Sequence, residues 1–157
     1  MKNIKIRKAV LSDLKIIQDL SQELFEHGAQ WDRYFNMSWS HGQDGEKFFR
    51  KVLTAKNRIC FIADIDGMVV GYLAASVLPI HSWRPVKRTE ITNLFVKEKF
   101  RGMKIGTKLL ESFLKWSKEK GVKRAVVVAN ANNAKAIIFY KKNRFLPEFV
   151  TLEGDIF

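Results

Sequence analysis

Residues 90–107, Glu-Ile-Thr-Asn-Leu-Phe-Val-Lys-Glu-Lys-Phe-Arg-Gly-Met-Lys-Ile-Gly-Thr, decide how the rest of the chain is organised. The branched and aromatic side chains within 90–96 predict a strand. Over 105–119, apolar residues recur every three or four positions and predict a helix. A basic turn with Gly102 and Gly106 joins the two. The first amides of a helix lack intrahelical acceptors and the helix dipole favours negative charge, so this stretch predicts an anion site.

The basic side chains of this turn favour a phosphate ligand, although an ordinary strand–turn–helix connection with a solvated basic face explains them equally well. The glycine spacing matches neither a Walker loop nor a G-x-G-x-x-G fingerprint, so nucleotide hydrolysis and dinucleotide binding lose support. Against the single acid Glu98 stand five basic residues: Lys97, Lys99, Arg101, Lys104 and Lys108.

The composition predicts one globular domain over residues 1–157, because 46% of the residues are hydrophobic. Positive charge is concentrated after the first third of the chain. Residues 1–46 hold 6 basic and 7 acidic side chains, whereas residues 47–157 hold 22 and 9. This excess fits a polyphosphate cofactor, a nucleic acid or a membrane surface. The chain has no recognisable nucleic-acid motif, so we predict no nucleic-acid partner.

The cysteine and histidine content argues against disulfides and metal sites. Cys60 is the only cysteine and lies in an apolar run, which indicates a buried structural thiol. His27, His41 and His81 do not have ligand spacing, so we predict no metal. There is no apolar signal-peptide core and no apolar run of about 18 residues, which predicts a cytoplasmic protein without a membrane partner.

The pattern along the chain alternates strands and helices. Two apolar runs joined by Asp66-Gly67 form the clearest predicted hairpin. The order of elements predicts an α/β protein with a mixed sheet and helices on both faces. Strands are predicted at 3–10, 59–65, 68–77, 90–96, 125–129 and 145–152, and helices at 13–27, 44–54, 105–119 and from Asn132 or Asn133 to about 142.

Two motifs give the chain a resemblance to a known family. Residues 101–106, Arg-Gly-Met-Lys-Ile-Gly, resemble the acetyl-CoA-binding motif of the GNAT N-acetyltransferase superfamily. Residues 133–145 are similar to its second signature, Asn-x-x-Ala-x-x-aromatic-Tyr followed by Gly-Phe. The order of elements agrees over nearly the whole chain. Two residues depart from the pattern, since Lys104 and Arg144 stand where the family usually has glycine.

The resemblance implies a GNAT-like, mostly antiparallel sheet of about six or seven strands with helices on both faces. It also implies an enzyme that transfers an acetyl group from acetyl-CoA to a primary amine of a small molecule or peptide, by direct attack in a ternary complex. A non-catalytic acyl-CoA-binding or regulatory module on the same fold is the alternative, because a fold does not fix a function. A homodimer is compatible with the resemblance, and the sequence does not identify the acceptor.

The resemblance assigns cofactor contacts to both motifs. Backbone amides of the turn would hold the pyrophosphate, and free backbone groups of the preceding strand would pair with the pantetheine arm. An amide at Leu94 or Phe95 could polarise the thioester carbonyl. Asn133 would bond the pantetheine arm, or else cap its helix. The expected cofactor-binding residues are Leu94, Phe95, Val96, Arg101, Gly102, Met103, Lys104, Ile105, Gly106, Thr107 and Asn133.

The resemblance also implies the catalytic groups. Tyr140 would protonate the leaving thiolate, unless its ring only packs. Glu90 is the expected base for the attacking amine, directly or through water, unless it is only an edge-strand charge, and His81 is a second candidate.

The aromatic segment 29–45 is either a lid over the acceptor or a flap that seals the core. As a lid it would bind a cationic amine through cation–π attraction, with Trp31, Tyr34 and Trp39 as the substrate-binding residues.

Overall fold

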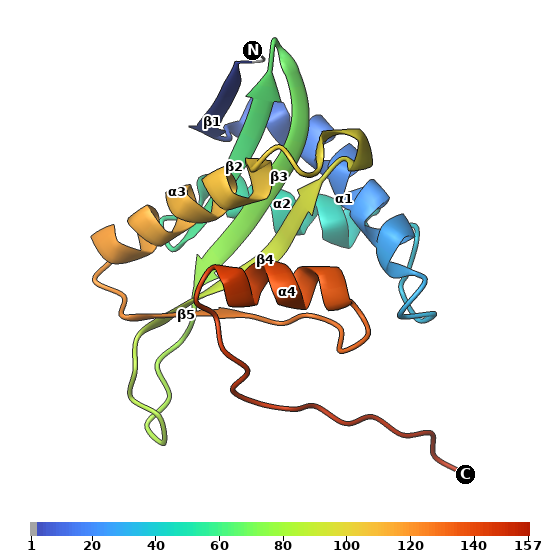
Figure 1. The fold of residues 1–157 in the computed structure, drawn as a ribbon, viewed down its shortest axis with the longest axis vertical. Helices are drawn as coiled ribbons and strands as arrows, with labels where there is room; N and C mark the ends of the chain where they lie inside the picture. The colour runs from blue at the N-terminus through green and yellow to red at the C-terminus, as the bar shows by residue number, and fades with distance from the viewer. Residues whose placement is uncertain (1–2) are drawn as a thin grey trace.

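The computed structural model describes residues 3–157 and contains a five-stranded mixed sheet (Figure 1). The strands lie in chain order, with the first four antiparallel and the fifth parallel to the fourth. Their bounds are β1 Ile4–Lys8, β2 Arg58–Ile65, β3 Met68–Val77, β4 Arg88–Val96 and β5 Arg124–Val127. The predicted α/β class is confirmed, with fewer strands than the expected six or seven.

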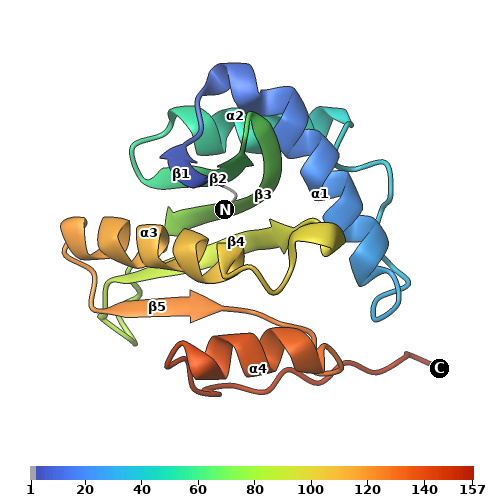
Figure 2. The ribbon, with the colours of Figure 1, turned by 45° about the horizontal axis from the view of Figure 1, so that its top comes forward.

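Four helices cover the sheet on its two faces (Figure 2). Helices α1 and α2 lie on one face, and α3 and α4 lie on the other. Single 3₁₀ turns precede α1 and α3. The bounds are η1 Leu11–Asp13, α1 Leu14–Gly28, α2 Gln43–Thr54, η2 Glu98–Phe100, α3 Ile105–Glu119 and α4 Ala134–Lys142. All four helices were predicted within a few residues of these bounds.

The β2–β3 hairpin forms as its turn sequence predicts. Asp66 and Gly67 have φ of 53° and 86°. Two successive positive φ values match the right-handed twist of the flanking strands, and Asp-Gly is a preferred pair for them. The hairpin places its alternating apolar residues on both faces of the sheet, because helices cover each face.

Two hydrophobic clusters follow from that alternation. Leu73 and Ala75 face α3, and the neighbouring Tyr72 and Ala74 face α1 and α2. Each cluster is closed by apolar helix residues, such as Phe113 on one face and Phe49 on the other. The central strands are therefore buried on both faces and form a rigid base for the elements beside them.

The predicted last strand, 145–152, is wrong. Only Phe145 of this segment is half-buried, and the residues after it are exposed and form no strand. Pro147 cannot donate a ladder hydrogen bond. The segment pairs with no strand edge in this chain, so its apolar side chains remain exposed and their pattern alone does not produce a strand.

Strand β4 is longer than its pairing with β5. The parallel ladder runs from the Arg88–Arg124 pair to the Ile91–Val127 pair and then stops. On its other edge, β4 stays paired with β3 as far as Val96. The sheet therefore opens between β4 and β5 after Ile91, beside the turn that leads into α3.

Candidate active site

The open edge of β4 presents unpaired backbone groups. The Lys97 amide donates to Val70 of β3, and backbone groups alternate in direction along a strand. The backbone N–H and C=O of Phe95 therefore point toward β3. Those of Leu94 and Val96 point toward the other edge of β4, where the pairing with β5 has ended. Of the two amides expected to polarise a carbonyl, Leu94 is the one on this open edge.

The turn after β4 leaves a run of free amides at the start of α3. The Arg101 amide donates to Glu98, and the Lys108 amide donates to Lys104 as the first helical bond. The amides of residues 105–107, in the first turn of α3, therefore have no intrahelical acceptor. Free donors at a helix N-terminus, among lysines, suit a polyanionic group such as a pyrophosphate.

Left-handed backbone shapes this turn. Gly102 has φ of 78°, and Lys104, which caps α3, has φ of 61°. Glycine adopts such a conformation without strain, whereas an L side chain adopts it at a cost. Lys104, which stands where the family usually has glycine, therefore occupies a position whose positive φ favours glycine. The same holds for Arg144, which has φ of 68°.

The second glycine of the turn joins the two motifs in space. A Cβ at Gly106 would lie 3.3 Å from the Phe139 ring of α4. A methyl group at this position would be a tight contact, and the ring would have to shift by a few tenths of an ångström. Gly106 therefore allows the Phe139 ring of α4 to pack closely on the first turn of α3.

Side chains anchor the turn to β4 and α1. Arg101 donates from Nε to the Val96 carbonyl oxygen at 2.9 Å and lies over the Phe95 ring. Lys97 pairs with Glu23 of α1, with 2.8 Å between Nζ and Oε1. These contacts hold the turn in place before any ligand binds, so the amides need little reorganisation.

Helix α4 carries the two expected residues of the second motif. Asn133 caps the helix, since its Oδ1 accepts from the Ala136 amide at 3.2 Å. This leaves the Asn133 side-chain amide free to donate. Tyr140 packs against the core cluster under α3, and its hydroxyl forms no hydrogen bond with the described residues. Burial raises the pKa of Tyr140, so the phenol is protonated near neutral pH.

Glu90 lies beside the opening, on the face of the sheet opposite Tyr140. Its neighbour Thr89 contacts Ser117 of α3 at 2.8 Å between the hydroxyl oxygens, and Ile91 packs under α3. Because successive side chains of a strand lie on opposite faces of the sheet, the Glu90 side chain lies on the face covered by α1 and α2. Among residues 3–157, no basic side chain forms a salt bridge with its carboxylate. His81 lies in the β3–β4 loop, where it stacks on Trp83.

The aromatic segment between α1 and α2 divides into a packed part and an open part. Trp39 stacks on Phe25 at 5.4 Å between ring centroids and contacts Phe48, so it helps seal the core. Trp31 is half-buried against His27. Tyr34 is 72% exposed. Of the three expected substrate-binding residues, Tyr34 is the most open to a ligand.

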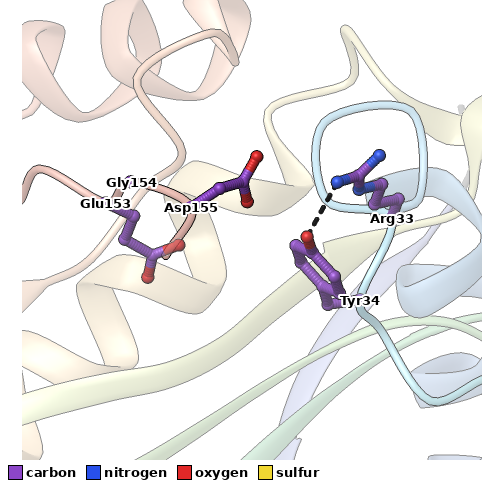
Figure 3. Close-up of a pocket in the computed structure, with 5 residues that line it drawn as sticks. All are labelled: Arg33, Tyr34, Glu153, Gly154 and Asp155. Atoms are coloured by element: carbon purple, nitrogen blue, oxygen red, sulfur yellow. Dashed lines mark hydrogen bonds between the residues drawn. The ribbon is translucent and has the colours of Figure 1, made fainter. Parts of the chain in front are cut away.

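Tyr34 lines an open hollow that the sequence did not predict (Figure 3). The hollow has a volume of about 520 Å³ and lies between the α1–α2 segment and residues 153–155 near the C-terminus. Arg33 donates to the Tyr34 hydroxyl at 2.8 Å, and Glu153 and Asp155 lie on the other side. Nothing in the sequence pattern links these two distant segments.

Two further residues near the opening were missed. Asn93 pairs with Ala74 of β3 just beyond the last β4–β5 pair, and its side-chain oxygen is buried without a hydrogen-bond partner among residues 3–157. His27, near the end of α1, has a lowered pKa because of burial and the positive charge of Arg101. Neither belongs to a motif, although an Asn inside an apolar strand is a signal that a search for buried polar residues would find.

A mixed sheet that opens beside a helix N-terminus with free amides is an arrangement suited to an extended anionic cofactor. The model of the acetyltransferase (GNAT) family matches residues 17–145, and the chain belongs to this family. It is an acetyl-CoA-dependent enzyme, as the two motifs predicted. The free amides, the lysines and the open β4 edge are groups that fit acetyl-CoA.

Curated relatives agree with this family. An uncharacterized N-acetyltransferase of Archaeoglobus fulgidus is 31% identical over 103 residues, which cover 66% of this chain and 70% of that protein. An N-alpha-acetyltransferase of Sulfurisphaera tokodaii is 31% identical over 108 residues, and the match covers 62% of each protein. A spermidine N(1)-acetyltransferase of Thermoplasma acidophilum is 22% identical, with 93% of this chain and 90% of that protein covered.

Solved structures share the fold. A Bacillus halodurans protein superposes with a TM-score of 0.85 at 18% identity, over 98% of this chain and 99% of the other. An aminoglycoside N-acetyltransferase in complex with CoA has a TM-score of 0.77 at 17% identity. The superposition covers 99% of this chain and 96% of the other. Within residues 3–157, no helix combines the length and apolar character needed to cross a membrane.

Proposed function

We propose that residues 1–157 form one N-acetyltransferase domain that moves an acetyl group from acetyl-CoA to a primary amine of a small molecule or peptide. The observation that carries this proposal is the open edge of β4, which leads through the turn to the free amides at the start of α3. An extended polar arm with a polyanionic end matches that arrangement.

The cofactor contacts divide between backbone and side chains. The amides of residues 102–107 hold the pyrophosphate, helped by the positive charge of the turn. Leu94 and the Val96 amide pair with the pantetheine arm as an added strand would, since the Val96 carbonyl already accepts from Arg101. The Leu94 amide donates to the thioester carbonyl oxygen and stabilises the negative charge that develops there. The Asn133 side-chain amide donates to the pantetheine arm.

The burial and protonation of the single cysteine thiol support direct attack by the amine on the thioester. Cys60 is buried, and burial raises its pKa, so it is protonated and inaccessible. An acyl-enzyme through a cysteine would need an exposed thiolate. The amine nitrogen therefore attacks the carbonyl carbon in a ternary complex, and the bond from that carbon to sulfur breaks.

Tyr140 delivers a proton to the leaving sulfur. Its phenol is protonated because burial raises its pKa, and its hydroxyl has no competing partner in the described chain. A thiolate formed in the same buried surroundings is also a stronger base than in water. The proton affinities of donor and acceptor therefore rise together, and transfer remains feasible.

Glu90 accepts the proton of the incoming ammonium group, directly or through water. It lies one residue before the last β4–β5 pair, on the face opposite Tyr140. Removal of one proton and delivery of another can then take place on opposite sides of the opening. His81 remains the second candidate, since it lies in the loop that precedes β4.

The acceptor binds beside the segment between α1 and α2, which carries Trp31, Tyr34 and Trp39, and the exposed Tyr34 is the ring most open to it. The names of the relatives give spermidine and N-alpha amines as acceptors of those proteins. Residues 1–46 carry nearly balanced charge, with 6 basic and 7 acidic side chains. This balance favours an acceptor with one amine, such as a peptide N-terminus, over a polycation.

A panel of amines tests the proposal. Thiol release from acetyl-CoA is followed with N-terminal peptides, lysine, spermidine and an aminoglycoside, and the products are identified by mass spectrometry. We expect a monoamine or peptide to be acetylated fastest, with intersecting initial-rate lines. Parallel lines would contradict direct attack, and acetyl-CoA hydrolysis without any acetylated amine would contradict the function.

A further inference from the structure

Positive charge gathers at both ends of α3. The turn around Lys104 lies where the helix begins, and a second basic region lies where it ends. We call residues 79–88 and 115–124 the distal basic surface, and they carry eight basic side chains and one acidic side chain. A helix of 15 residues is about 22 Å long, so this surface is remote from the turn that leads into α3. The basic residues of the distal basic surface are Arg84, Lys87, Arg88, Lys115, Lys118, Lys120, Lys123 and Arg124.

Contacts between neighbouring elements bring the two segments of this surface together. Lys87, in the loop between β3 and β4, donates from Nζ to the carbonyl oxygen of Lys120 at the end of α3. Arg88 at the start of β4 lies opposite Arg124 at the start of β5. Figures 1 and 2 show the β3–β4 loop and the end of α3 toward the same side of the molecule, away from the turn that leads into α3. The basic side chains therefore lie in one region of the surface.

Little of this charge is neutralised within the chain. Glu148 lies 3.6 Å from Arg84 and 3.5 Å from Arg124. Among residues 3–157, no carboxylate forms an ion pair with the other six basic side chains of the distal basic surface. Lysines at a helix end stabilise the helix dipole, which accounts for Lys118 and Lys120 but not for the basic side chains of the β3–β4 loop. Because the like charges repel one another, an anionic partner would stabilise them.

The β3–β4 loop adds an aromatic ring to this charge. Trp83 at its tip is 75% exposed, and Ile80 is 60% exposed. The His81 ring stacks on Trp83, with 5.7 Å between the ring centroids and 17° between the planes. The Arg84 amide donates to the His81 carbonyl oxygen at 3.0 Å, which closes the tip of the loop. The indole is therefore held in a stack of flat rings and is still open to a further flat ring.

We propose that the distal basic surface binds single-stranded nucleic acid. The phosphates contact the lysines, and one base stacks on Trp83. Aromatic stacking beside a basic track is how proteins bind single strands without sequence preference. A duplex suits the loop less well, because its bases are already stacked on one another. The interaction involves no acetyl transfer, so it is independent of the proposed reaction.

The prediction of no nucleic-acid partner rested on the lack of a recognisable motif. The structure places eight basic residues away from the cofactor turn, and binding by stacking and charge requires no sequence motif. An anionic membrane is the weaker alternative. Ile80 and Trp83 are the only large apolar side chains of the distal basic surface that are exposed, whereas a surface that lies on a membrane buries a larger apolar face.

Fluorescence anisotropy of a labelled oligouridylate of about 12 nucleotides tests the proposal, since site sizes of this order are typical for single strands. The full-length protein is titrated at about 50 to 200 mM salt, and each phosphate contact should add about 0.7 to the slope of log K against log salt. Lys118→Gln/Lys123→Gln removes two exposed charges from the distal basic surface. It should lower that slope by about 1.4 and the affinity by about tenfold.

Two matched controls separate this surface from the candidate active site. Lys104→Gln/Lys108→Gln removes two charges from the start of α3 and should change the affinity for the oligouridylate by less than about twofold, because salt screens charges at that distance. Trp83→Ala should weaken binding about fivefold or more through the loss of base stacking. Tyr34→Ala, which removes a ring that is 72% exposed on the segment between α1 and α2, should leave binding unchanged.

Several outcomes would overturn the proposal. One is the absence of binding at about 50 mM salt. Others are an affinity that both double variants lower equally, one that only Lys104→Gln/Lys108→Gln lowers, and one that Trp83→Ala leaves unchanged. Vesicles of phosphatidylserine and phosphatidylcholine are titrated in parallel. Binding to these vesicles without binding to the oligouridylate would identify a membrane surface in place of a nucleic-acid surface.

Discussion

The part of the protein before residue 118 and the part after it differ in how they are packed. Every fully buried side chain lies in the first part, which contains β1–β4 and α1–α3. Residues 118–157, with β5, α4 and the C-terminal segment, contain none. The first part is a rigid scaffold that fixes backbone amides, and the second is looser and supplies Asn133 and Tyr140. The candidate active site lies where they meet, between the free amides of the first part and the two side chains of the second.

The largest expected effect is on turnover, and it should be seen when the tyrosine of the looser part, Tyr140, is substituted but not when one of the packed part is. Tyr140→Phe should lower turnover about 10- to 10⁴-fold, because the leaving thiolate loses its proton donor. The affinity for acetyl-CoA should change little. Steady-state kinetics and calorimetric titration give the two quantities.

Tyr72→Phe is the matched control, because it removes the same hydroxyl from the core of the packed part. Its turnover should equal that of the wild type. If Tyr140→Phe also kept full turnover between about pH 7 and 9, Tyr140 would have no part in the chemistry.

Stability should depend on the packed part far more than on the looser one. Phe113 is fully buried, and Phe113→Ala should lower the free energy of unfolding by about 3–5 kcal/mol. Ile138 of α4 is 51% exposed, and Ile138→Ala should cost less than about 1 kcal/mol. Urea denaturation measures both. Equal losses would mean that the two parts are packed alike.

The two parts also differ in their ion pairs. Arg7 donates twice to the buried Asp13 carboxylate, both at 2.8 Å, and this contact lowers the pKa of Asp13. Asp13→Asn should cost about 1–3 kcal/mol near neutral pH. Glu148 is half-exposed in its longer contacts, and Glu148→Gln should cost less than about 0.5 kcal/mol.

The stabilisation that the Arg7–Asp13 pair contributes should fall as the pH is lowered. Because the folded pKa lies below the unfolded value, the stabilisation is complete above about pH 5 and is lost as the pH falls through the folded pKa. The difference between wild type and Asp13→Asn in thermal denaturation should therefore shrink below about pH 4. A difference that stayed constant down to about pH 2 would contradict this pairing.

The smallest effect concerns the two residues with left-handed backbone where the family usually has glycine. Lys104→Gly and Arg144→Gly should each stabilise the fold by up to about 1 kcal/mol, because the strain of a side chain at positive φ is relieved. Only Lys104→Gly should also weaken acetyl-CoA binding, because it removes a positive charge from the turn. Thermal denaturation and titration with acetyl-CoA distinguish the two effects, and an equal change in affinity for both variants would contradict the site.

The sequence predicts the packed part well because its signals are local. The Asp66-Gly67 pair sets the hairpin, and the apolar spacing over 105–119 gives α3 at its observed bounds. The free amides after this turn were also predictable, because the first turn of a helix that begins at Ile105 lacks intrahelical acceptors. Helix α4 was predictable from its Asn133 cap.

The looser part was less predictable because its structure depends on what lies beside it. The apolar residues of 145–152 predict a strand, but a strand needs a partner edge that the chain does not bring to it. The hollow between Tyr34 and Asp155 joins segments far apart in the sequence, so no local pattern indicates it. Asn93 was missed because its unpaired oxygen is evident only once β4 and β5 are seen to separate.

The most direct test of the central claim is amide hydrogen exchange of the protein with and without acetyl-CoA. We predict that acetyl-CoA slows exchange at the amides of residues 102–107 and at Leu94 and Val96, because each gains an acceptor there. Amides in the β2–β3 turn should not change. Tight binding of acetyl-CoA without protection at these amides would contradict the placement of the site between the two parts.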